Sequence, residues 1–276
     1  MAGINYLFGF DLNSKNIIIV ITTITLVALF SVLRGLNAGI KRLSEINILL
    51  AIGLCLFIFL SSSALEIIQN SLSYTVDFLR NLPTLSNWID RSDSDFLHGW
   101  TVFYWAWWIS WSPFVGMFIA RVSRGRSIRE FLVGTIIFPS VISVIWLTLF
   151  GDNAINQFLS EGNRNVIDTI RNESPEMSIY KFLEGFPFSE ITSLVAITLI
   201  CIFFITSMDS GALVIDTIAS NGKTNTPVQQ RILWCLLIGL IAIALTLSGG
   251  LGALQSMALA TAFPFCFILL SMCVST

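Results

Sequence analysis

Residues 100–120 of the chain read WTVFYWAWWISWSPFVGMFIA, and this stretch decides how the rest of the sequence is interpreted. It contains no Asp or Glu, and five of the chain's eight tryptophans lie in it. A helix of about 20 predominantly apolar residues is long enough to cross the ~30 Å hydrocarbon core of a bilayer. We therefore expect a membrane-spanning helix with an unusual aromatic surface.

The composition of the whole chain agrees with a membrane protein. Of its 276 residues, 55% are hydrophobic and 12% are charged, whereas soluble domains carry roughly 25% charged residues. The formal net charge of -2 does not suggest a nucleic-acid partner. The single histidine excludes a multi-histidine metal centre, and the five cysteines form no CxxC pair. We predict an all-α, polytopic membrane protein.

Seven stretches are candidates for membrane-spanning helices. They are residues 16–33, 46–63, 100–120, 131–150, 191–208, 232–247 and 253–273. Lys and Arg gather in the short connections that follow the first, third and fifth spans, which places these connections in the cytoplasm. We expect the protein in the cytoplasmic (inner) membrane, with its N-terminus on the outer side and its C-terminus in the cytoplasm. A chain that begins outside without a signal sequence is natural for a fragment of a longer protein.

Four connections have a recognisable character. Residues 66–99 place apolar side chains near helical spacing, which predicts an amphipathic helix on the outer surface. Residues 151–190 read as a polar outer loop with some short helix. Residues 220–227, on the inner side, and 248–252, on the outer side, read as tight turns.

The aromatic side chains of residues 100–120 form a stripe. At about 100° per residue, Trp100, Tyr104, Trp107 and Trp111 lie within about 60° of one another on a helix, with Trp108 at the edge of the stripe. One interpretation is an interfacial aromatic belt. The other is a box of rings for a cation, because the stripe continues more than halfway across the span.

A quaternary ammonium group fits such a box. It has no N–H to donate, its charge is diffuse, and indole faces attract it by ~0.5–2 kcal/mol each. A primary amine would call for a carboxylate, and residues 100–120 contain none. Ser110, Ser112, Pro113 and Gly116 follow the stripe, and they predict a kinked or interrupted helix of the kind that transporters use for substrate sites.

A second polar cluster closes the fifth predicted span. Thr206, Ser207, Asp209 and Ser210 lie in an otherwise apolar segment, and an ionisable group there is costly and usually functional or paired. Hydroxyl and carbonyl oxygens are ligands for a small hard cation, so sodium is chemically plausible. Alternatively, the hydroxyls bond back to their own helix and Asp209 is a cap or an interfacial charge. We find no P-loop, GxSxG or HExxH motif, so we do not expect an enzyme or a cofactor.

Several segments together resemble the betaine/choline/carnitine transporter family. They are residues 100–131, the Gly39–Ser44 stretch GIKRLS, the Thr206–Ser210 stretch TSMDS, and Phe263–Phe265. The resemblance covers essentially the whole chain. It implies a LeuT-like fold of two inverted five-helix repeats in a twelve-span protein, of which this chain matches spans six to twelve. Residues 1–276 are then one partial membrane domain, with 16–65 the last two helices of the first repeat, 66–99 the outer helix and loop, and 100–276 the second repeat.

The resemblance also implies roles for particular residues. Trp107, Trp108 and Trp111 correspond to the central substrate box, with Trp100 nearer the outer mouth. Phe203, Thr206 and Ser207 correspond to part of a sodium site, and Asp209 to a carboxylate near the inner gate.

The expected function is alternating-access, cation-coupled transport of glycine betaine, choline or carnitine by a protein that assembles as a homotrimer. A seven-span receptor-like protein, or a truncated product without activity of its own, remains as an alternative.

Overall fold

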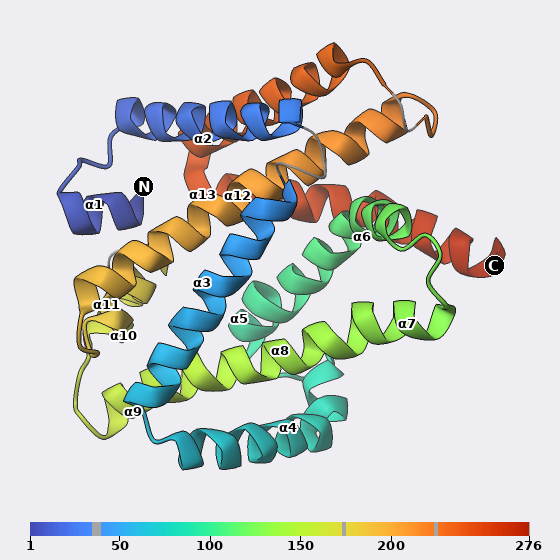
Figure 1. Cartoon of the computed structure of the whole chain (residues 1–276). Coiled ribbons are helices and arrows are strands. Elements are labelled where there is room, and N and C mark those ends of the chain that lie inside the picture. Colours follow the sequence, from blue (N-terminus) through green and yellow to red (C-terminus); the bar gives the residue numbers. More distant parts are fainter. Residues whose placement is uncertain (35–39, 173–174, 224–225, 276) are drawn as a thin grey trace. The chain divides into compact units, whose positions relative to one another are not determined.

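The computed structural model of the chain describes all residues except 35–39, 173–174, 224–225 and 276. Gly39 and Glu173 lie outside the described residues, as do residues 224–225 of the predicted inner turn. All regular secondary structure in the described part is helical (Figure 1). Its elements are α1 (Ala2–Phe8), α2 (Ser14–Arg34), α3 (Ile40–Ser61), α4 (Ala64–Ser86), α5 (Ser94–Phe96), η1 (Leu97–Val102), α6 (Phe103–Val122), α7 (Ile128–Leu132), η2 (Val133–Ile137), α8 (Phe138–Leu147), η3 (Thr148–Asp152), α9 (Asn153–Leu159), α10 (Asn165–Asn172), η4 (Pro175–Met177), α11 (Ser178–Leu183), α12 (Ser189–Ala219) and α13 (Val228–Ser275). The elements η1, η2 and η3 are π-helical turns and η4 is a 3₁₀ turn.

Six helical segments of the described chain are long and apolar enough to cross a membrane. They are Ser14–Leu33, Lys41–Ser61, Ile128–Leu159, Ser189–Ala219, Val228–Gly250 and Gly252–Ser275. They confirm six of the seven predicted spans. The remaining predicted span, residues 100–120, forms the end of η1 and most of α6. It is not among the six segments, because Trp, Tyr, Ser and Pro lower the mean hydropathy of α6. Its passage through the membrane stays a prediction.

Several boundaries differ from those predicted, and the fourth span runs on to Leu159. The prediction ended the fifth span at residue 208, whereas α12 runs on to Ala219. The polar cluster does not stop this helix, because the Thr206 hydroxyl bonds to carbonyls of its own helix and apolar Ala212, Leu213 and Val214 continue it as buried residues. The sixth span is also longer than predicted, and reaches Gly250.

The two predicted surface features of the outer side are present as helix and turn. α4 confirms a helix in residues 66–99 and extends from Ala64 to Ser86. The turn in residues 248–252 interrupts α13 at two glycines, where Gly250 has φ +59° and ψ -134°. A side chain at that backbone conformation would be strained, so glycine lets the chain reverse between the last two spans.

The chain divides into two compact units, each described here by itself. One consists of residues 1–82 and 126–207, and the other of residues 83–125 and 208–276. The predicted division into a partial first repeat and a complete second repeat stays a prediction.

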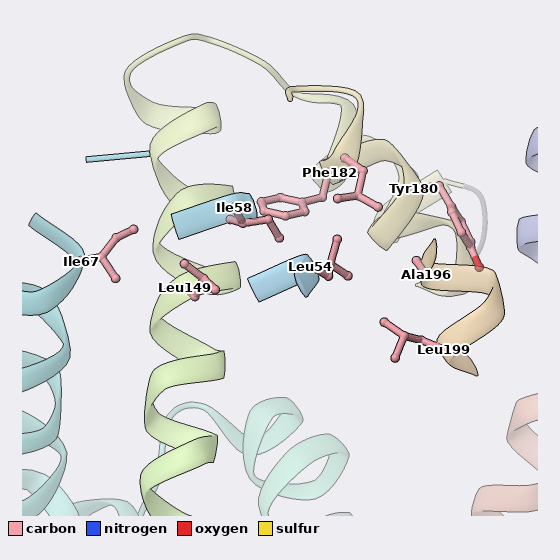
Figure 2. Close-up of a cluster of buried hydrophobic side chains, with 9 residues drawn as sticks. Leu54, Ile58, Ile67, Leu149, Tyr180, Phe182, Ala196 and Leu199 are labelled. Carbon is pink, nitrogen blue, oxygen red and sulfur yellow. The ribbon is translucent and has the colours of Figure 1, made fainter. Parts of the chain in front are cut away.

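The core of the first unit gathers apolar side chains from α3, α4, η3, α11 and α12 (Figure 2). Its members are Leu54, Ile58, Ile67, Leu149, Tyr180, Phe182, Leu183, Ala196 and Leu199. Three of them belong to α11, inside the segment that the sequence analysis described as a polar loop with some short helix. Short helix is present there, but the burial of the pattern Tyr-x-Phe-Leu was not predicted, because a six-residue helix has too few turns to show a clear period.

The segment around α11 also makes polar and aromatic contacts to α1. The Tyr6 hydroxyl donates to Glu184 Oε1 at 2.9 Å, and Lys181 Nζ donates to the same oxygen at 2.9 Å. The rings of Tyr6 and Tyr180 stack with centroids 5.4 Å apart. Gly3 permits this approach, because a Cβ at that position would stand 2.2 Å from the Tyr180 hydroxyl oxygen.

We expect Leu183→Ala to lower the free energy of unfolding by about 2–5 kcal/mol, because the buried leucine would leave a cavity in the core. The measurement is thermal or denaturant unfolding of the purified protein in detergent. Leu159→Ala is the matched control, since Leu159 on the neighbouring α9 is 71% exposed. Equal losses in the two variants would contradict this account of the core.

Candidate functional site

The aromatic residues of η1 and α6 form two groups of contacts within the second unit. The first is a ladder of rings: Trp100 and Tyr104 have centroids 6.0 Å apart with planes inclined by 8°, and Tyr104 and Trp107 are also 6.0 Å apart, inclined by 26°. The second is the pair Trp111 and Phe114, whose rings meet edge to face at 5.0 Å. The aromatic side chains of the predicted stripe therefore contact one another along the helix. They form a ladder from Trp100 to Trp107 and a separate pair, Trp111 and Phe114.

The ladder begins before the predicted stripe. Phe96 of α5 stacks on Trp100 with centroids 6.5 Å apart. The π-helical turn η1 carries Trp100, and such turns shift the register of the side chains that follow and often occur at functional sites. The sequence analysis missed Phe96 because it began the span at Trp100, although the i, i+4 spacing of the two rings was visible.

Trp108 differs from its neighbours in exposure. It is 73% exposed, whereas Trp111 is 39% exposed. Trp107 is 42% exposed and contacts both Tyr104 and Phe103. Of the three tryptophans assigned to the substrate box, Trp107 and Trp111 are thus partly covered by other rings, and Trp108 presents the largest free surface.

α6 is not interrupted at Pro113. The helix runs from Phe103 to Val122 with the proline inside it, so the predicted interruption is wrong, while a kink at Pro113 stays a prediction. The π-helical turn η1 lies before the helix. Proline removes the N–H that would bond to the carbonyl four residues earlier, Ile109. The Ser112 hydroxyl donates to that carbonyl at 2.8 Å and replaces the lost bond. The Ser110 hydroxyl donates to the Trp107 carbonyl at 2.8 Å.

The predicted ion-site residues lie on α12. The Thr206 hydroxyl donates to the Ile202 carbonyl at 3.0 Å and to the Phe203 carbonyl at 3.1 Å, as the back-bonding alternative predicted. Phe203 and Ser207 are exposed on one side of the helix. Thr206 and Ser207 belong to the first unit, and the aromatic residues of α6 belong to the second.

Asp209 is buried, with 5% of its surface exposed. This burial does not fit an interfacial charge, and it does not fit a helix cap either, because α12 continues to Ala219. Two residues later, Gly211 brings α12 close to two other helices. A Cβ on Gly211 would lie 3.7 Å from the Phe114 ring of α6 and 3.6 Å from Ile238 Cδ1 of α13. Phe114 therefore stands between α12 and Trp111.

Comparisons with known proteins agree with the transporter interpretation. The model of the betaine/carnitine/choline family transporters matches residues 1–276. A glycine betaine/proline/choline transporter of Vibrio parahaemolyticus is 48% identical over 274 residues, which are 99% of this chain and 49% of that protein. A glycine betaine transporter of Acinetobacter baylyi is 41% identical over 99% of this chain and 41% of that protein. The glycine betaine transporter 1 of Vibrio parahaemolyticus is 44% identical over 99% of this chain and 52% of that protein.

These relatives are transporters, which favours a transporter over the receptor-like alternative and excludes classification as an enzyme. The chain spans about half the length of the curated relatives it matches.

We expect Ser112→Ala to lower the free energy of unfolding by about 1 kcal/mol, because the Ile109 carbonyl next to Pro113 would lose its donor. Ser110→Ala is the control, since the Trp107 carbonyl retains the backbone N–H of Trp111 as a regular helix partner. Thermal unfolding of the two purified variants in detergent measures the difference. Equal effects of the two substitutions would show that Ser112 does not compensate for the proline.

Proposed function

Because the chain belongs to the betaine/carnitine/choline transporter family, we propose that it supplies the aromatic part of a binding site for a quaternary-ammonium solute in a secondary active transporter. The substrates proposed are glycine betaine, choline or carnitine. The residues proposed to contact the cation are Trp100, Tyr104, Trp107, Trp108 and Trp111. The cycle would be alternating access, in which substrate and coupling ion both stabilise an occluded state.

The observation that carries the proposal is an acid-free helix with a continuous row of aromatic rings. From Phe96 to Trp107 the successive rings lie 6.0–6.5 Å apart, and residues 100–120 contain no carboxylate. A methylated cation gains from aromatic faces and needs no hydrogen-bond acceptor. A primary amine bound here would keep its N–H donors unpaired, which is unfavourable in an apolar site.

The names of the relatives support the same class of substrate. Three of them are named as transporters of glycine betaine, and one of these also of proline and choline. A fourth, at 42% identity, is named for ectoine in addition. The chain is proposed to act within a protein of about the length of these relatives, as a multi-pass protein of the cytoplasmic membrane. Assembly into a homotrimer is proposed from the family resemblance alone.

We also propose that sodium is the coupling ion and that Phe203, Thr206 and Ser207 contribute to its site. The Thr206 hydroxyl donates to two carbonyls of its own helix, Ile202 and Phe203. Hydroxyl oxygens are among the ligands that a small hard cation prefers. Asp209, buried on the same helix, is proposed to act in the inner gate.

Transport can be tested in a chimera. The segment of the Vibrio parahaemolyticus glycine betaine/proline/choline transporter that aligns with this chain is replaced by residues 1–276, and uptake of labelled glycine betaine, choline and carnitine is measured in cells. We expect Trp108→Leu to raise the KM for the transported solute about tenfold, which corresponds to ~1.4 kcal/mol from one lost cation–π contact.

Trp105→Leu is the matched control for this substitution. Trp105 lies on another side of α6 and is 66% exposed, so its loss should leave the KM within about twofold of the parent value. The aromatic-box proposal fails if Trp108→Leu transports all three solutes with the KM of the parent chimera.

Thr206→Val in the same chimera is expected to raise the sodium concentration for half-maximal uptake, because it removes the oxygen ligand while preserving the shape of the side chain. Thr198→Val is the control, since the Thr198 hydroxyl donates to the Leu194 carbonyl in the same helix at 2.8 Å and is not proposed to bind sodium. Uptake that does not depend on sodium in the parent, or depends on it equally in both variants, would refute the sodium site.

A further inference from the structure

A buried acid lies near the inner end of α12 and has no part in the site described above. Asp216 is 2% exposed, although it stands only three residues before the helix ends at Ala219. A carboxylate removed from water in this way persists in a fold only if other groups compensate its charge. The sequence analysis passed over Asp216 because a single acid near a helix end is usually solvated.

Asp216 contacts the inner loop at both ends of that loop. Its backbone carbonyl accepts hydrogen bonds from the Ser220 N–H at 3.0 Å and from the Ser220 hydroxyl at 2.7 Å. Its carboxylate oxygen Oδ2 accepts a hydrogen bond from the Thr226 hydroxyl. Thr226 lies two residues before α13 begins at Val228. One residue of α12 thus holds the loop where it leaves α12 and where it enters α13.

The same carboxylate is paired with the first turn of α13. Arg231 Nε lies 3.8 Å from Asp216 Oδ2. This distance gives an ion pair without a hydrogen bond, and the Arg231 side chain is 22% exposed, so the pair is largely removed from water. A buried pair contributes little net stability, but removing one partner leaves an uncompensated charge. We define Asp216, Ser220, Thr226 and Arg231 as the inner-loop clasp.

A second contact joins the same two helices further into the span. Gly211, five residues before Asp216 on α12, lies against Ile238 of α13, seven residues after Arg231. Gly211 also lies against Phe114, whose ring contacts Trp111. All of these residues belong to the second unit. α12 and α13 are therefore connected at two places, Asp216 with Arg231 and Gly211 with Ile238. The second of these also contacts Phe114 of the aromatic helix α6.

We propose that Asp216 is a positioning residue, which locks the inner loop and the beginning of α13 to the end of α12 so that these segments move as one body. The clasp then keeps Gly211 against Phe114 while the inner side of the path opens and closes. The lock is independent of the substrate, whereas its part in transport rests on the proposed function.

Cleavage after Lys223 tests the lock without any transport measurement. Lys223 is exposed in the inner loop, and endoproteinase Lys-C cuts only after lysine. The parent chimera and its variants are purified in detergent, and the rate of cleavage after Lys223 is followed by mass spectrometry, with cleavage after Lys15 as the internal reference. We expect Asp216→Asn and Thr226→Val to speed cleavage after Lys223 at least about fivefold, because a released loop reaches the protease more often.

Thr226→Val is included because it keeps the ion pair and is the milder change if Asp216→Asn folds poorly. Thr246→Val is the matched control, since the Thr246 hydroxyl donates to the Ala242 carbonyl of α13 at 2.6 Å and does not contact the loop. Cleavage rates in Thr226→Val and Asp216→Asn equal to that of Thr246→Val would overturn the proposal. Arg231→Lys should stay closer to the parent than Arg231→Gln, because only the former retains the charge.

The uptake assay tests the role in transport. We expect Thr226→Val to lower the maximal rate about fivefold while the KM stays within about twofold, because the rings that bind the solute are unchanged and only the motion is impaired. If Thr226→Val speeds cleavage after Lys223 but leaves the maximal rate of uptake unchanged, the role of the clasp in transport is wrong. A parent chimera without uptake would count against the proposed function, and the cleavage result would still decide the clasp.

Discussion

The constraint on which this structure depends is that a helix in lipid must satisfy its own polar groups. Water is absent from the bilayer core, so every backbone N–H and C=O must bond within the protein. Hydroxyl side chains obey the same rule, and those of Thr25, Thr135, Thr198 and Thr246 each donate to the carbonyl four residues earlier. Pro113 breaks the regular pattern, and Ser112 restores it at the Ile109 carbonyl. The continuity of α6 follows from this local repair.

The same constraint explains how charged groups are arranged. A buried carboxylate needs compensation for its charge, and Asp216 Oδ2 has it in the Thr226 hydroxyl and the Arg231 guanidinium. Elsewhere, Asp152 accepts from the Asn70 amide at 2.8 Å and from the Tyr74 hydroxyl at 2.6 Å, which ties α4 to the end of the fourth span. The hydrogen bond to Asp152 raises the pKa of Tyr74. The aromatic stretch of residues 100–120 differs in that it carries no acid at all, which is the basis for proposing that it binds a methylated cation.

The apolar core of the first unit also includes residues from the connection between the fourth and fifth spans. Residues between the fourth and fifth spans fold into short helices that bury Tyr180, Phe182 and Leu183. A segment with so many polar residues reads as a loop, yet its few large apolar side chains find partners on α3 and α12. Such a pattern is too short to be recognised from periodicity, and its burial depends on neighbours that belong to other helices.

The sequence by itself determined the membrane class, the positions of six spans, the outer helix, the glycine turn and the acid-free aromatic face. These features depend on local composition and helical period, which a single chain displays directly. Only the tertiary structure decided that the aromatic stripe divides into a ladder and a pair, that α12 continues past its polar cluster, and that Asp216 joins Thr226 and Arg231. These depend on which side chains meet across different helices, and the physical reason is that burial and pairing arise between residues that sequence spacing alone does not bring together.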